Sequence, residues 1–163
     1  MPQDTHSNEI YPGLWLGDVN ALNKKFISDN GISCIINCTM SIPFPKSRQI
    51  KHCYRLPVKD NLAPDQIYRM YTMFDYIIDI IVKHLPDERI LIHCHAGRQR
   101  SVAVIAAFLM KIGDMTKNEA ILCIQSKRAV AGVPQVNFDP TLSEYEKDLL
   151  QLKEQLKKPK SAD

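Results

Sequence analysis

Apolar residues along the chain fall into two patterns, short continuous runs and longer stretches with a helical period. Continuous runs bounded by polar residues predict buried strands at 14–16, 34–37 and 90–93, and a further strand is expected at 54–58. Five other segments predict helices, and the longest has apolar residues at helical spacing along its whole length. The expected helices cover residues 21–29, 64–84, 100–111, 116–127 and 143–157.

Local signals mark where several of these elements begin or end. Asn30 and Gly31 form a good C-terminal stop for the first helix. Thr116 and Glu119 have the spacing of a capping box, which opens the helix that follows. The segment 41–51 is polar and contains two prolines, so a loop is expected there.

The order of these elements predicts the fold class. Strands that alternate with helices favour an α/β fold, with a central, mainly parallel sheet flanked by helices on both faces. At 163 residues the chain is most economically one domain. We expect a flexible N-terminus at 1–8, a single domain at 9–158 and a flexible tail at 159–163.

Composition and charge narrow the function classes. The net charge of +3 favours anionic partners slightly but is too small to predict nucleic-acid binding. The five cysteines are scattered and odd in number, which favours free thiols in a reducing compartment, the cytoplasm or the nucleus. Their spacing indicates no metal site, and no cofactor is expected. No apolar segment follows Met1, so neither a signal peptide nor a membrane span is expected.

The most informative stretch joins the strand at 90–93 to the helix at 100–111. Cys94 ends the apolar run, five residues follow, and Arg100 begins the helical pattern. A loop between a strand and a helix N-terminus points several backbone N–H groups at one place, where they bind phosphate or stabilise a thiolate. A guanidinium can hold two phosphate oxygens at once. The stretch therefore predicts attack by the sulfur of Cys94 on phosphorus.

Neighbouring residues support the same interpretation. A cation in the first turn of a helix is disfavoured by the helix dipole unless an anion lies there, so Arg100 favours a bound phosphate. Gly97 suits a backbone that must curl around a ligand, since glycine adopts positive φ readily. His93 is expected to support the loop from a buried position rather than to act as a base.

The motif His-Cys-X-X-Gly-X-X-Arg-Ser at 93–101 resembles the signature of the protein tyrosine phosphatase superfamily. The apolar helix that follows resembles its dual-specificity branch in particular. Other segments stand in the order that this branch shows, and the resemblance covers about nine tenths of the chain. These segments are 10–17, 31–39, 57–60, 126–128 and 136–138.

The resemblance implies an active site and a two-step mechanism. Cys94 would be the nucleophile that forms a phosphocysteine, and Ser101 would donate to its sulfur and ease the release of phosphate. Asp60, in a Val-X-Asp pattern, would protonate the leaving oxygen and then activate water. Asp65 is the rival acid, although its place at a helix start has a structural explanation. The loop would bind phosphate through the residues Cys94, His95, Ala96, Gly97, Arg98, Gln99 and Arg100.

The substrate is expected to be a phosphorylated protein, with phosphotyrosine and phosphoserine or phosphothreonine all accepted. His95 and Arg98 place additional positive charge in the loop, and Gln99 stands where the branch usually has serine. These departures leave open a more highly charged substrate, such as an inositol phosphate, a phosphoinositide or an RNA 5′ end. A non-catalytic phosphate-binding module is a further alternative, against which the joint presence of Cys94, Arg100 and Asp60 argues.

The last helix carries apolar residues at alternating spacings of three and four. They are Leu142, Tyr145, Leu149, Leu152 and Leu156. This stripe is expected to dock the helix on the core. Its extension toward the end of the chain leaves a weak homodimer open beside a monomer.

Overall fold

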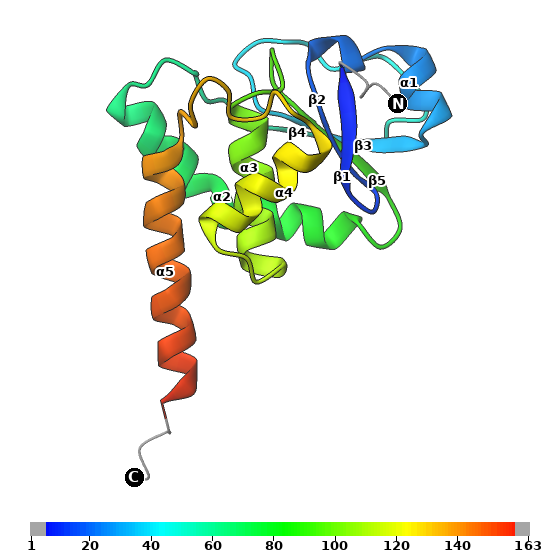
Figure 1. The fold of residues 1–163 in the computed structure, drawn as a ribbon. Helices are drawn as coiled ribbons and strands as arrows, with labels where there is room; N and C mark the ends of the chain where they lie inside the picture. The colour runs from blue at the N-terminus through cyan, green and yellow to red at the C-terminus, as the bar shows by residue number, and fades with distance from the viewer. Residues whose placement is uncertain (1–5, 159–163) are drawn as a thin grey trace.

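The computed structural model describes residues 6–158, which form a five-stranded sheet with helices on both faces (Figure 1). The strand order is β1-β2-β5-β3-β4, where β1 is antiparallel to β2 and all other neighbours are parallel. The mainly parallel α/β sheet expected from the sequence is thereby confirmed. The strands are β1 (Ser7–Tyr11), β2 (Leu14–Gly17), β3 (Ile32–Asn37), β4 (His52–Arg55) and β5 (Arg89–His93).

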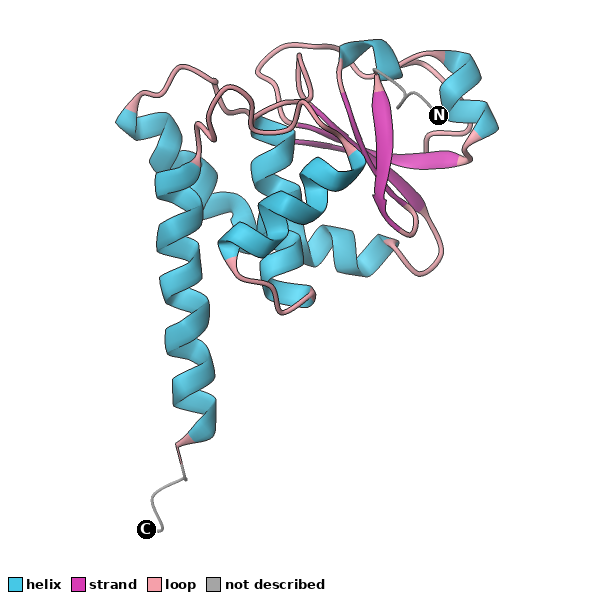
Figure 2. Cartoon of the chain, viewed as in Figure 1, coloured by secondary structure: helices cyan, strands magenta, loops and turns pink. Residues whose placement is uncertain are grey.

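Three longer helices lie against one face of the sheet, a fourth packs on those helices, and a short helix covers the other face (Figure 2). None of the helices within residues 6–158 combines the length and the apolar character needed to cross a bilayer. The helical elements are the 3₁₀ turn η1 (Val19–Ala21), α1 (Lys24–Asp29), α2 (Pro64–His84), α3 (Arg100–Ile112), α4 (Lys117–Lys127) and α5 (Asp139–Lys157).

The central strands divide their side chains between two hydrophobic clusters. Ile90 and Ile92 of β5 face the large cluster beneath α2–α5, whereas Leu91 between them belongs to the small cluster beneath α1. This alternation follows from the two-residue period of a strand. All three side chains are buried. Because a strand that is covered on both faces needs apolar residues throughout, residues 90–92 include no polar residue.

Several expected boundaries are confirmed. Helix α2 begins at Pro64 and ends at His84, as its apolar spacing predicts, and residues 41–51 form no helix or strand. Thr116 caps α4 by accepting a hydrogen bond from the backbone N–H of Glu119 at 3.1 Å. The helix expected at 21–29 is instead two pieces, because Asn23 accepts from the N–H of Phe26 and starts α1 there.

Strands β1 and β4 differ from the sequence-based expectation. Strand β1 includes Ser7 and Asn8, which fall in the range expected to be flexible, while residues 1–5 and 159–163 lie outside the described residues. An edge strand with polar residues shows no apolar run, which explains why it was not predicted. Strand β4 begins earlier than expected and ends at Arg55, although Leu56 and Val58 remain buried beyond it.

Helix α5 starts four residues earlier than the expected 143, and its two halves have different surroundings. Its start at Asp139 places a proline in the first turn, where proline lacks only an unneeded N–H donor. Leu142 and Tyr145 are buried against the core, but Leu152 and Leu156 are exposed. The first half therefore docks as expected, while the second half extends away from the body of the molecule (Figure 1).

Candidate active site

Cys94 lies where the central strand β5 ends and the loop to α3 begins. Strand β5 is hydrogen-bonded to β2 on one side and to β3 on the other, so this loop opens at the middle of the sheet. Ligands of open α/β folds bind at the carboxyl ends of the strands, where loops from several strands meet. The loop at 94–100 occupies that position, immediately before the N-terminus of α3.

The thiol of Cys94 is 2% exposed and lies beside the hydroxyl of Ser101, with Sγ and Oγ 3.1 Å apart. Ser101 belongs to the first turn of α3 and is itself completely buried. The sulfur is therefore close to a helix N-terminus and to a hydroxyl that can donate to it.

Gly97 allows the loop to turn tightly against its neighbours. Its φ is +63°, and an added Cβ would lie 2.8 Å from the carbonyl oxygen of Gly17. Arg128, at the C-terminal end of α4, is buried beside it and donates to the carbonyl oxygens of Gly97 at 2.9 Å and Ala96 at 3.3 Å. These bonds hold two peptide groups of the loop in place from the side of α4.

Arg100 begins α3, and its side chain turns toward the loop that follows β4. One terminal nitrogen donates to the carbonyl oxygen of Val58 at 3.1 Å. The Nε atom is buried and has no hydrogen-bond partner among residues 6–158. Because buried donors are nearly always paired, an anion that fills this donor is the expected occupant.

His93 precedes the cysteine and is completely buried. Its Nδ1 lies 3.3 Å from the carbonyl oxygen of Cys94. Burial lowers the pKa of His93 to about 4, against the smaller opposing effect of that hydrogen bond. The imidazole is therefore neutral at pH 7, and this placement is consistent with the supporting role expected from the sequence.

Asp60 lies on the loop between β4 and α2, and a chain of hydrogen bonds joins it to the loop at 94–100. Its Oδ1 accepts from Nδ2 of Asn137 at 2.9 Å. The backbone N–H of Asn137 donates in turn to Oε1 of Gln99 at 2.9 Å. Gln99 also donates to the carbonyl oxygen of Gln135 at 2.7 Å. The carboxyl group is thus tied to the cysteine loop through two side chains.

Asp65 has different surroundings, although it is only five residues away. It is the acidic residue in the first turn of α2, and its Oδ2 accepts from Nε2 of Gln66 at 2.9 Å. The other side-chain atom of that amide, Oε1, accepts from the backbone N–H of Lys59 at 2.8 Å. These contacts give Asp65 a structural place at the helix N-terminus.

Two of the residues expected to bind phosphate face outward. His95 and Arg98 are exposed and line a depression of about 460 Å³ beside the loop. Asp18, which caps η1, and Asn20 within η1 also line this depression. The depression mixes cationic and acidic groups, so it is not a purely basic surface.

Sequence reasoning located the loop but missed three residues that hold it. The segments 126–128 and 136–138 were visible as part of a family pattern, yet nothing in them indicated that Arg128 grips the loop or that Asn137 reaches Asp60. Gln99 was expected to bind phosphate as part of the loop and stood out as a departure from the family pattern, but its contacts outside the loop were not expected. Its amide spans to the segment before α5, a contact that no local signal predicts.

Comparison with known proteins gives one consistent family. The family model for the dual specificity phosphatase catalytic domain matches residues 14–148. The chain is 32% identical to human dual specificity protein phosphatase 16, over 86% of this chain but 21% of that protein. It is 33% identical to human dual specificity protein phosphatase 14, over 86% of this chain and 69% of that protein. The chain thus spans about a fifth of the length of the first relative and about two thirds of the second.

Solved structures agree with the sequence comparison. The crystal structure of human DUSP28 superposes with a TM-score of 0.75 at 25% identity, over 91% of this chain and 98% of that one. The crystal structure of DUSP15 superposes with a TM-score of 0.76 at 26% identity, over 97% of this chain and 100% of that one.

Proposed function

Because the chain belongs to the dual specificity phosphatase family, we propose that it hydrolyses phosphotyrosine and phosphoserine or phosphothreonine in proteins. The observation that supports this best is the grouping of Cys94, Ser101 and the partly unpaired guanidinium of Arg100 at one helix N-terminus. This arrangement offers a nucleophile and an anion site within one loop, and the reaction needs both at the same place.

The first step is attack by the Cys94 thiolate on phosphorus. The S–P bond forms as the bond to the leaving oxygen breaks, which leaves a phosphocysteine. Arg100 and the backbone N–H groups of the loop hold the equatorial oxygens, whose charge is spread in the loose transition state. In this mechanism the charge is balanced by protein groups, and no metal ion takes part.

Asp60 is the proposed general acid for this step. Its tether through Asn137 to Gln99 connects it to the same loop that holds the phosphate. Within residues 6–158, no such chain of hydrogen bonds joins Asp65 to the cysteine loop, and the N-terminus of α2 accounts for its position. A protonated Asp60 gives its proton to the departing alkoxide or phenoxide, which could not leave readily without it.

The second step hydrolyses the phosphocysteine. Water attacks phosphorus, the ionised Asp60 accepts a proton from it, and the S–P bond breaks to regenerate the thiolate. The Ser101 hydroxyl, 3.1 Å from the sulfur, donates to the developing negative charge and makes the sulfur a better leaving group.

Phosphorylated proteins are the proposed partners, and nucleic acid is not expected among them. The depression beside His95 and Arg98 contains the acidic Asp18, which disfavours a substrate with several clustered phosphates. All five cysteines are free thiols, which favours a reducing compartment, the cytoplasm or the nucleus. We expect a monomer or a weak homodimer, since the exposed apolar side chains of α5 span only its second half.

The test is phosphate release from a peptide that carries both phosphothreonine and phosphotyrosine, with the Cys94→Ser variant as the blank. Release from both positions supports the proposal. Release from neither, while the folded protein still hydrolyses a small aryl phosphate, overturns the protein substrate and directs the search to inositol phosphates or RNA ends. Loss of aryl phosphate hydrolysis as well would instead support a binding module.

A further inference from the structure

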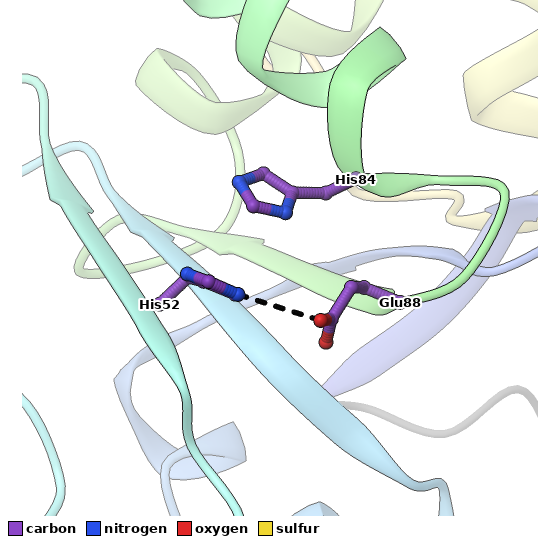
Figure 3. Close-up of side chains that lie close together, drawn as sticks. All are labelled: His52, His84 and Glu88. Atoms are coloured by element: carbon purple, nitrogen blue, oxygen red, sulfur yellow. Dashed lines mark ion pairs between the residues drawn. The ribbon is translucent and has the colours of Figure 1, made fainter.

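Three side chains that could bind a metal ion meet at the amino-terminal ends of the parallel strands, opposite Cys94. His52 begins β4, His84 ends α2, and Glu88 immediately precedes β5. One potential ligand atom from each lies within 4.8 Å of those of the other two (Figure 3). Strands β4 and β5 both begin here, whereas the cysteine loop follows the carboxyl end of β5. The three side chains and the cysteine loop therefore lie at opposite ends of β5.

We propose that His52, His84 and Glu88 bind one zinc ion, with a water molecule as the fourth ligand. Two histidines and one glutamate are a ligand set that zinc accepts, and such sites keep their fourth position for solvent. His52 is partly exposed, which gives an ion a path to the site and room for that water.

The distances suit a tetrahedral ion. Nε2 of His52 lies 3.4 Å from Oε1 of Glu88. Bonds of about 2.0–2.1 Å in a tetrahedron place two ligand atoms roughly 3.4 Å apart. The rings of His52 and His84 have their centroids 4.3 Å apart. A zinc ion could therefore join the first two ligand atoms at their present separation, and His84 offers a third ligand atom within 4.8 Å of both.

Two of the three ligands, the buried His84 and the partly buried Glu88, are each oriented by a second residue. The Tyr54 hydroxyl lies 2.7 Å from Nε2 of His84, while the other ring nitrogen faces His52 and Glu88 (Figure 3). When Nε2 donates to Tyr54, Nδ1 carries the lone pair that a metal needs.

The carboxylate of Glu88 is held in the same way. The Ser33 hydroxyl donates to Oε2 of Glu88, and the other carboxylate oxygen, Oε1, faces His52. Metal-bound histidines and carboxylates are characteristically held by such outer hydrogen bonds. An ordinary surface ion pair has no need of them.

The end of helix α2 also suits a cation at this place. His84 is the last residue of α2, and the C-terminal end of a helix attracts positive charge.

The experiment measures zinc binding to the full chain by calorimetry, with Co²⁺ absorption as a report of tetrahedral geometry. Cys94→Ser serves as the background, because a reactive thiolate also binds zinc. We expect one zinc per chain, a raised melting temperature, and at least a tenfold loss of affinity in Glu88→Gln and in His52→Asn. Tyr54→Phe removes only the outer bond to His84 and should weaken binding by about tenfold.

His6→Asn is the matched control. Nδ1 of His6 also lies 3.0 Å from a carboxylate oxygen, that of Asp18, but this pair is next to the carboxyl end of β2. The affinity of this variant for zinc should equal that of the background protein. The proposal is overturned if no zinc binds, or if Glu88→Gln and His52→Asn, shown by circular dichroism to be folded, bind as tightly as the control. Because phosphatase activity is not measured, the result is independent of the proposed function.

Discussion

The two ends of strand β5 carry opposite kinds of polar cluster. At the carboxyl end, the N-terminus of α3, the buried Nε of Arg100 and the Cys94 loop present donors and positive charge. At the amino end, the C-terminus of α2 supplies His84, which meets Glu88 and a second histidine. Since the dipole of a helix is positive at its N-terminus and negative at its C-terminus, one end favours an anion and the other a cation.

This contrast follows from parallel topology. The parallel strands all begin at one end of the sheet and finish at the other. The helix after a strand starts at the carboxyl ends of the strands and returns to their amino ends. The N-termini of the helices therefore lie at the carboxyl ends of the strands, and the C-termini of the helices lie at the amino ends. The two clusters should be separable by mutation, because they lie at opposite ends of a rigid strand and share no side chain.

The largest effect is expected from removing Cys94, the proposed nucleophile at the carboxyl end of β5. Cys94→Ser should lower turnover of phosphopeptides by more than about a thousandfold, because serine is not ionised at neutral pH. Phosphopeptide binding should persist, since Arg100 and the loop remain. Steady-state kinetics and equilibrium binding measure the two quantities. Substantial turnover in this variant would contradict the assignment of Cys94.

The next largest effect is expected from replacing Asp60, the proposed general acid. Asp60→Asn should slow phosphopeptide hydrolysis by about a hundredfold or more and slow an aryl phosphate with a good leaving group far less, because only the poor leaving group needs the proton. Asp65→Asn is the matched control and should change both rates little. The ratio of kcat values for the two substrates is the measurement, and the opposite ranking of the variants would transfer the role to Asp65.

A third comparison uses pH and stability. Burial holds the pKa of His93 at about 4, below the usual 6.5, so the unfolded chain binds the extra proton first as pH falls. The stability due to neutral His93 is present above pH 6.5 and is lost progressively between 6.5 and 4, by about 2 kcal/mol at pH 5. Urea unfolding at pH 7.5 and pH 5 measures this loss, and His93→Asn should reduce it. An equal loss in that variant would assign the effect to other groups, such as His84, whose pKa burial also lowers.

The smallest effect tests the tether between the cysteine loop and the acid. Gln99→Ala removes the amide that accepts from the N–H of Asn137, and we expect kcat for phosphopeptides to fall by roughly tenfold because Asp60 is positioned less well. Asn137→Ala should have a similar effect, and the double variant should lose little more than either alone, because the residues act in one chain. Hydrolysis of the aryl phosphate with a good leaving group should be affected less. Additive losses would show that the two residues act independently.

Comparison of individual elements shows which features local sequence could predict. Helix α2 has a regular apolar period and a proline in its first turn, so both of its ends were predicted correctly. Strand β1 was missed because it is a polar edge strand, whose pairing with β2 rather than its own pattern makes it a strand. The expected start of α5 is too late because the apolar stripe begins only at Leu142, whereas the helix begins at Asp139.

The same distinction applies to the two polar clusters. Cys94, Arg100 and Ser101 are within eight consecutive positions, so their meeting at one helix N-terminus was visible from the chain alone. His52 is remote in sequence from His84 and Glu88, and the cysteine spacings used to judge metal sites could not show that these three residues converge. The contact between Gln99 and the segment before α5 is equally remote.

The sequence by itself determined the α/β class and the position of the cysteine loop between β5 and α3, because both depend on residues adjacent along the chain and on backbone periodicity. Tertiary structure decided which acid is tied to that loop, what holds the loop from behind, and that a second polar cluster exists at the far end of β5. These features depend on strands and helices that lie far apart in the sequence and meet only when the apolar faces of the sheet are buried.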